Sequence, residues 1–207
     1  MITLYHCANA RSFRALWMLE EAGLDYELKL LPFPPRVRQP EYLEENPLGT
    51  IPLLIDGETR MTESSAICEY IAAKYAPELG VRPDESSFGA YLNALHFGEA
   101  TLTFPQTLVL RYTMLEPEER RLPQAAEDYR KWFLGRLKGL GRILENSDYV
   151  AADRFTAADV SVAYAILLAG SLRIEEALND PKIAAYWERM KARDGFKRAK
   201  QAQKLDG

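Results

Sequence analysis

Residues 45–75 read ENPLGTIPLLIDGETRMTESSAICEYIAAKY, and this stretch decides the fold of the first part of the chain. Pro52–Ile55 and Thr59–Met61 are runs of strand length, and the Asp56-Gly57 pair between them is a strong hairpin signal. Thr62–Tyr75 then carries apolar residues at the spacing of a helix with one buried face. The stretch therefore predicts a β-hairpin followed by a helix.

The residues before this stretch show strand and helix patterns in turn. Three elements are predicted there: a strand at Ile2–His6, a helix at Ser12–Ala22 that ends at Gly23, and a strand at Tyr26–Leu31. The run PFPPRVRQP is expected to lack regular structure up to Glu41, because proline has no backbone N–H to donate. These elements predict an α/β domain over residues 1–78, with helices on a mixed four-stranded sheet.

The rest of the chain has a different texture. A polar segment at residues 79–86 contains Gly and Pro and is typical of a linker. Residues 87–207 then show helical patterns at Phe88–Leu115, Gln124–Leu144, Ala157–Leu172 and Pro181–Lys200. Pro105 is expected to kink or break the first of these helices. Thr156 and Asp159 have the spacing of a capping box at the start of the third. An all-helical second domain is predicted.

Composition excludes several classes of protein. The 207 residues are 47% apolar and 27% charged, with a net charge of −4, which is typical of a globular protein. No basic block predicts a nucleic-acid partner, and the sequence predicts neither a membrane-spanning helix nor a secretory signal. Cys7 and Cys68 lack CxxC spacing, and His6 and His96 are isolated, so no metal site is predicted. We expect a cytoplasmic protein.

Three segments together resemble one known family. They are the stretch at 45–75, the opening ITLYHCANARSFRALWMLEEAGL and the later FTAADVSVAYAI. The chain is similar along nearly its whole length to cytosolic, bacterial-type glutathione transferases. The resemblance implies a thioredoxin-like domain followed by a helical domain, usually in a symmetric homodimer. It also implies a detoxifying enzyme that conjugates glutathione, its co-substrate, to a hydrophobic electrophilic small molecule.

The resemblance implies a backbone contact with glutathione at Thr50, Ile51 and Pro52. Taken alone, Ile51-Pro52 predicts a trans proline at the start of a strand, because only ~5–6% of X–Pro bonds are cis. In the similar family this proline is cis. The N–H and C=O of Ile51 would then pair with the cysteinyl part of glutathione like an added strand.

Two further contacts with glutathione follow from the resemblance. Thr62–Ser65 taken alone is a helix cap with an acidic first turn. In the family, Ser64 and the helix N-terminus would bind the γ-glutamyl carboxylate, and Glu63 would pair with its ammonium. Arg36 or Arg38, in the proline-rich run, would reach the glycyl carboxylate, although two arginines in a loop are usually just solvated.

The residue that activates the thiol is expected immediately before the first helix. The position that usually holds the catalytic hydroxyl is occupied by Asn9, which donates hydrogen bonds but cannot accept a proton. The other candidates, in order, are Ser12, whose position also suits an N-cap, and Arg11, whose charge would stabilise a thiolate. Cys7 is expected to be a small buried residue rather than a nucleophile.

The second substrate is expected between the two domains. Leu102, Phe104, Leu108, Arg111 and Tyr112 lie on the long helix that should face the thiol. Apolar residues at helical spacing more often form core than pocket, and Arg111 could equally form an ordinary ion pair.

Two other functions remain open, and the missing hydroxyl at position 9 favours the first of them. One is a glutathione-binding or regulatory protein that keeps the fold without turnover. The other is a glutathione-dependent disulfide reductase or isomerase. The absence of cysteine at positions 9–12 disfavours a mixed disulfide on the protein itself.

Overall fold

The computed structural model describes residues 1–204 and divides into two compact units. The first unit contains residues 1–80 together with the segment from Lys191 onward, and the second unit contains Val81–Met190. Residues 87–207 are predicted as the helical domain, and the last helix of that range makes its contacts with the unit that contains the sheet.

The first unit is built on a four-stranded sheet in the order β2-β1-β3-β4. The strands are β1 (Ile2–His6), β2 (Tyr26–Leu30), β3 (Leu53–Asp56) and β4 (Thr59–Met61). β1 pairs parallel with β2 and antiparallel with β3, and β3 pairs antiparallel with β4. The mixed sheet and the Asp56-Gly57 hairpin are therefore confirmed. β1 lies between β2 and β3, which explains why most of its residues are buried.

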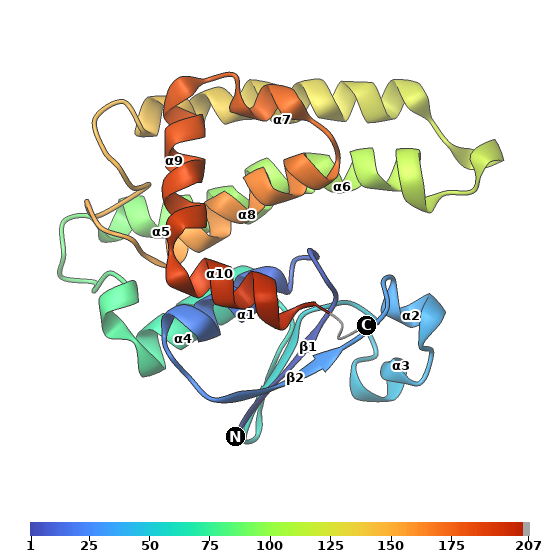
Figure 1. The fold of residues 1–207 in the computed structure, drawn as a ribbon, viewed down its shortest axis with the longest axis horizontal. Helices are drawn as coiled ribbons and strands as arrows, with labels where there is room; N and C mark the ends of the chain where they lie inside the picture. The colour runs from blue at the N-terminus through green and yellow to red at the C-terminus, as the bar shows by residue number, and fades with distance from the viewer. Residues whose placement is uncertain (205–207) are drawn as a thin grey trace. The chain divides into compact units, whose positions relative to one another are not determined.

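Helix α1 (Phe13–Glu21) is covered on more than one side within this unit. It packs against α4 (Ser64–Tyr75) and against α10 (Asp194–Ala202), which lies alongside it in Figure 1. The ring of Phe196 on α10 meets the rings of Phe13 and Trp17 edge-on, with centroids 5.5 and 5.0 Å apart. Because neighbours cover it this way, every residue from Phe13 to Leu19 is fully buried.

The C-terminal pattern at Pro181–Lys200 was predicted as one helix and forms two. They are α9 (Pro181–Ala192) and α10, separated at Arg193, whose ψ of 139° is extended. The guanidinium of Arg193 donates to both carboxylate oxygens of Glu21 at 2.8 Å. A Cβ at Gly195 would lie 2.5 Å from the Glu21 carboxyl carbon, so a larger residue there would displace the carboxylate that Arg193 binds. The break allows α10 to lie along α1.

The proline-rich run also differs from its prediction. It contains the short helix α2 (Pro35–Arg38), and α3 (Tyr42–Glu45) follows it. Pro35 opens α2, where its missing N–H would have no intrahelical partner in any case. Prolines disfavour a strand because they cannot donate to its neighbours, but they are compatible with the first turn of a helix.

The second unit is helical. Its α-helices are α5 (Phe88–His96), α6 (Phe104–Leu110), α7 (Pro123–Ile143), α8 (Ala157–Ser171) and most of α9. Wider π-helical turns occupy Phe97–Thr103 and Arg111–Leu115. Short 3₁₀ turns occupy Glu118–Arg120 and Glu175–Leu178. A further 3₁₀ turn, Pro77–Leu79, lies near the end of the first segment of the first unit. The predicted helix at 88–115 is thus interrupted near Pro105, as expected.

Helix α8 forms the core of the second unit. Its capping box is confirmed, because the Thr156 N–H donates to the Asp159 carboxylate at 2.9 Å. Asp159 also accepts from the Val150 N–H at 3.0 Å and from the Tyr186 hydroxyl at 3.1 Å. These bonds offset the cost of burying the carboxylate. Within residues 1–204, no helix is both long and apolar enough to cross a membrane.

Candidate functional site

Residues 8–12, the β1–α1 segment, connect the central strand to the first helix. Asn9 has a φ of +56°, in the left-handed region that asparagine adopts more readily than most residues do. Asn9 and Arg11 are half-buried. The first catalytic candidate thus lies at the turn of the segment, and its backbone conformation suits asparagine better than serine.

Ser12 occupies the N-cap position of α1, but its side chain does not cap the helix. The hydroxyl lies 2.7 Å from Nδ1 of His6 and accepts from the Cys7 N–H at 3.2 Å. The prediction of a capping hydroxyl was therefore wrong: a buried imidazole competes for it. Ser12 is fully buried, which leaves its side chain inside the protein rather than at a surface that meets a ligand.

Cys7 is a buried structural residue, as expected. Its side chain is fully buried, and its Sγ lies 3.7 Å from the Pro32 carbonyl oxygen. Burial raises the pKa of the Cys7 thiol to about 12. A thiol of this kind is not ionised near neutral pH and is a poor nucleophile.

The loop Thr50–Pro52 is held rigidly by two side chains. Tyr42 Oη and Asn46 Nδ2 both donate to the Thr50 carbonyl at 2.8 Å. The Ile51–Pro52 bond is cis, as the resemblance implied. Ile51 lies outside the sheet ladder, and within residues 1–204 its N–H and C=O take part in no backbone hydrogen bond. Both groups are thus available for pairing with an extended peptide.

A buried cluster joins this loop to the β1–α1 segment. Its members, with Ala10 packed against them, are Tyr5, Cys7, Tyr42, Ile51 and Leu53. The Tyr5 and Tyr42 rings lie 5.4 Å apart, and Tyr5 is the register partner of Leu53. The two segments are far apart in sequence, yet Ala10 and Ile51 belong to one packed group.

The start of α4 is joined to α1 through a buried arginine that the sequence analysis missed. Arg14 is fully buried, and its Nη1 donates to Ser64 Oγ at 3.2 Å. Because a guanidinium only donates, the Ser64 hydroxyl proton must point elsewhere. Glu63, the preceding residue, is exposed. The burial of Arg14 could have been predicted from the sequence, because apolar residues flank it on both sides in the helical segment FRALWML.

Gly49 distinguishes Arg36 from Arg38. Both arginines are exposed on α2. A Cβ at Gly49, whose φ is +61°, would lie 2.8 Å from the Cβ of Arg36, so the Arg36 stem packs directly on this glycine. Arg36 therefore lies next to the start of the Thr50–Pro52 loop.

The residues predicted for the second substrate belong to the second unit. Phe104 is 48% exposed, and its ring meets that of Tyr129 edge-on at 6.5 Å. Arg111 forms an ion pair with Glu116 at 2.8 Å and lies over the Tyr112 ring. Leu108 is half-buried. Leu102 is fully buried, so it is core rather than pocket.

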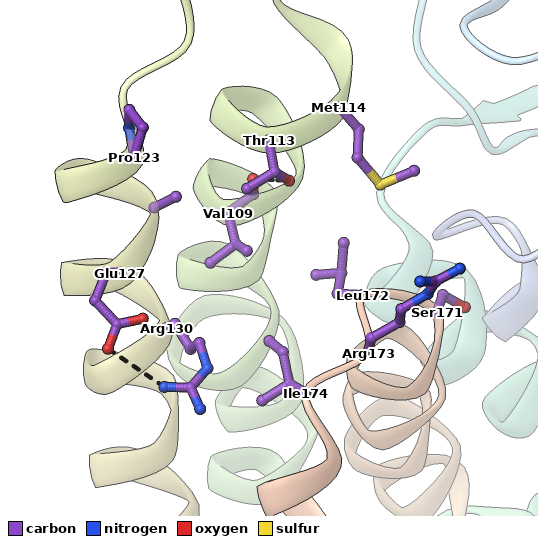
Figure 2. Close-up of a pocket in the computed structure, with 11 residues that line it drawn as sticks. Val109, Thr113, Met114, Pro123, Glu127, Arg130, Ser171, Leu172, Arg173 and Ile174 are labelled. Atoms are coloured by element: carbon purple, nitrogen blue, oxygen red, sulfur yellow. Dashed lines mark hydrogen bonds and ion pairs between the residues drawn. The ribbon is translucent and has the colours of Figure 1, made fainter.

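A pocket of about 600 Å³ lies within the second unit (Figure 2). Apolar side chains of Val109, Met114, Leu172 and Ile174 contribute to its lining. Figure 2 shows Glu127 joined to Arg130, which is thereby partly neutralised. None of the five predicted residues lines this pocket, although Val109 and Met114 come from the same helical stretch.

Comparison with known proteins identifies the family. Residues 1–73 match the N-terminal domain of glutathione S-transferases, and residues 107–201 match their C-terminal domain. Glutathione S-transferase 3 of Zea mays is 31% identical over 191 residues, which cover 89% of this chain and 86% of that protein. The chain belongs to the glutathione S-transferase family. Relatives that bear this name match over most of their length, so the protein is a glutathione transferase.

Solved structures show that the transferase fold extends over nearly the whole chain. A glutathione transferase from Phanerochaete chrysosporium, solved with oxidized glutathione, is 25% identical, with a TM-score of 0.85 over 98% of this chain and 96% of that one. One from Methylococcus capsulatus is also 25% identical, with a TM-score of 0.84 and 98% of each chain covered. The thioredoxin-like domain and the helical domain are therefore confirmed.

Proposed function

We propose that this transferase binds glutathione in its first unit and activates the thiol at the β1–α1 segment for attack on a hydrophobic electrophile. One observation carries the proposal. Three separate stretches of chain, predicted to hold three parts of glutathione, are joined within that unit. Ala10 packs against the buried cluster that contains Ile51, and Arg14 of α1 donates a hydrogen bond to Ser64 of α4.

The contacts support a role for each end of the tripeptide. Ser64 and the N-terminus of α4 bind the γ-glutamyl carboxylate, and the buried charge of Arg14 makes this end of the helix more electropositive. The exposed Glu63 pairs with the ammonium group. The backbone of Ile51 pairs with the cysteinyl residue, with Thr50 and Pro52 on either side. Arg36, which packs on Gly49, binds the glycyl carboxylate in preference to Arg38.

Thiol activation requires a shift of about two pKa units, or ~3 kcal/mol, from the ordinary value near 8.5. In the proposed site, the Asn9 amide donates to the thiolate, which contributes roughly 1.5–3 kcal/mol for a charged acceptor. The N-terminus of α1 and the charge of Arg11 add about 1 kcal/mol. Ser12 acts indirectly, through its bond to His6.

The electrophile is bound by Phe104, Leu108, Arg111 and Tyr112. Their exposed or half-buried side chains support an adaptable apolar surface with one cation. The enzyme holds both reactants in order, and glutathione supplies the nucleophilic sulfur. No proton acceptor is needed on Asn9, because the thiol ionises to solvent before attack.

A homodimer is the proposed assembly, in the cytoplasm. An exposed aromatic face on α7 supports it: the ring of Trp132, 47% exposed, stacks on Tyr129 at 5.5 Å, and Arg136 lies over it. Sedimentation should show a dimer that Trp132→Arg weakens. A wild-type monomer at micromolar concentration would contradict this assembly.

The proposed function is tested by calorimetric titration with glutathione and by conjugation of a panel of chromogenic electrophiles. Binding together with thiol conjugation supports the transferase mechanism. Binding without turnover of any electrophile would favour a regulatory protein. Reduction of a glutathionyl mixed disulfide in preference to conjugation would favour a reductase.

A further inference from the structure

The C-terminal helix α10 reaches the first catalytic candidate directly. Lys200 Nζ donates to the side-chain oxygen of Asn9 at 2.7 Å, and Gln203 Nε2 donates to the same oxygen at 2.8 Å. The Asn9 backbone N–H in turn donates to Gln203 Oε1 at 3.0 Å. Residues about 190 positions away in sequence thus contact both the backbone and the side chain of Asn9.

These contacts determine which way the Asn9 carboxamide is turned. The oxygen and nitrogen of an amide are similar in shape, so chemistry must distinguish them. An ammonium group has donors and no acceptor, so the atom that faces Lys200 is the oxygen. The amide NH₂ group consequently lies on the side of the carboxamide away from Lys200.

The hydrogen bonds continue through the interior to the other end of the β1–α1 segment. His6 is fully buried, and burial lowers its pKa to about 4, so its ring is neutral near pH 7. Its Nε2 donates to Gln203 Oε1 at 3.1 Å, and its Nδ1 accepts from the Ser12 hydroxyl at 2.7 Å. A network of hydrogen bonds therefore runs from Ser12 through His6 and Gln203 to Asn9, and each donor in it has one acceptor.

Lys200 is a half-buried cation at this segment. No carboxylate of residues 1–204 forms an ion pair with it, whereas Lys197, one turn earlier on α10, pairs with Asp194 at 3.0 Å. Its ammonium lies 5.7 Å from the centre of the Phe13 ring. The neighbouring charge is Lys204, also a cation. Lys200 is thus committed to the Asn9 oxygen rather than to an acid.

We propose that Lys200 and Gln203 are positioning residues for thiol activation: they hold the oxygen of the Asn9 carboxamide so that its NH₂ group faces the thiolate of bound glutathione. The inference rests on the proposed role of Asn9. It assigns to the C-terminal helix a part in the chemistry, in addition to its packing on α1.

The test is a double-mutant cycle between positions 9 and 200. Asn9→Gly removes the carboxamide and accepts the left-handed backbone, and Lys200→Met removes the charge while keeping the length of the stem. The readout is the pKa of enzyme-bound glutathione, measured by the ultraviolet absorbance of the thiolate. Calorimetry on the same proteins gives the dissociation constant of glutathione.

Lys200→Met should raise the bound thiol pKa by about one unit, which corresponds to a roughly tenfold loss of kcat/KM below that pKa. Lys200→Arg should restore it, Lys197→Met should leave it unchanged, and the glutathione dissociation constant should stay within about twofold throughout. In the Asn9→Gly background, Lys200→Met should cause no further shift, because the group that it orients is gone.

The outcomes separate the two proposals. Equal shifts from Lys200→Met in both backgrounds, or none in either, would overturn the positioning role and leave Asn9 as the activating residue. No shift from Asn9→Gly would overturn both. Gln203→Glu gives a second probe, because a carboxylate cannot donate to the Asn9 oxygen and would draw Lys200 away. It should raise the thiol pKa in the wild-type background alone, and thermal unfolding would verify that each variant is folded.

Discussion

Two regions are proposed to meet a reactant, the β1–α1 segment and the α6 surface, which we define as Phe104, Leu108, Arg111 and Tyr112. They are built in opposite ways. Around the segment, His6, Ser12 and Gln203 are buried and are joined by hydrogen bonds. On the α6 surface, Phe104 and Arg111 are exposed and Leu108 and Tyr112 are half-buried. Arg111 is held there by the nearby Glu116.

This difference matches the two reactants. Glutathione never changes, so a site fixed in advance loses little entropy on binding and keeps its donors aligned. Electrophiles vary in shape, and exposed side chains held by local contacts can adapt to several of them. Substitutions at the β1–α1 segment should therefore lower activity strongly and to the same extent with every electrophile. Substitutions on the α6 surface should have small effects that differ between electrophiles.

The largest effect is expected on stability at acid pH, through His6. Its pKa is lowered to about 4 in the folded state, below the ordinary value of 6.5, so the folded protein binds fewer protons between these values. Stability is full above pH 6.5 and falls by up to about 3 kcal/mol as the pH drops to 4. His6→Gln should flatten this fall, as measured by urea unfolding at several pH values.

The control for that experiment lies in the second unit. Burial raises the pKa of Asp159 to about 6, which gives a slope of opposite sign in the same range of pH. The quantity to compare at each pH is therefore the difference in free energy of unfolding between His6→Gln and wild type. The contribution of Asp159 is the same in both proteins and cancels in this difference. A pH-independent difference would contradict the neutral, buried His6.

The next largest effect is expected from Asn9→Asp. Aspartate keeps an oxygen for Lys200 and Gln203 but replaces the amide donor with a negative charge. The bound thiol pKa should rise by roughly one to two units, and the pH–rate profile should move with it. A profile that does not move would show that another group activates the sulfur.

Ser64→Ala should weaken glutathione binding about tenfold, because the γ-glutamyl carboxylate loses a donor and Arg14 loses its acceptor. Ser65→Ala, at the adjacent position, is the matched control and should change affinity far less. Calorimetric titration measures both. Equal losses at the two serines would remove the specific assignment to Ser64.

The smallest effects are expected on the α6 surface. Leu108→Ala and Arg111→Ala should raise KM for the electrophile about two- to fivefold, unequally across a panel, without changing glutathione affinity. Thr107→Ala, on the same helix, is the control. Uniform losses across all electrophiles would erase the contrast between an adaptable surface and a fixed site.

Local signals in the sequence predicted most of the fold. The Asp56-Gly57 hairpin, the capping box at Thr156 and the interruption near Pro105 all depend on residues close together in the chain. The split at Arg193 was missed although Asp194-Gly195, a pair typical of turns, follows it directly. What fixes it is the ion pair with Glu21, more than 170 residues away.

The site was harder to predict for the same reason. Its candidate residues could be named by resemblance, but their partners could not. Arg14 is buried only because α1 is covered on more than one side, and Ser12 turns from the helix only because His6 is near. The contact between Asn9 and Lys200 cannot be predicted from the sequence pattern of either segment.

The most direct test of the account is a pH titration of thiolate absorbance in the wild-type protein saturated with glutathione. Free thiols titrate near pH 8.5, and the bound thiol should titrate about two units lower, within the range where the enzyme is folded. A bound thiol that titrates at the value of free glutathione would contradict activation at the β1–α1 segment.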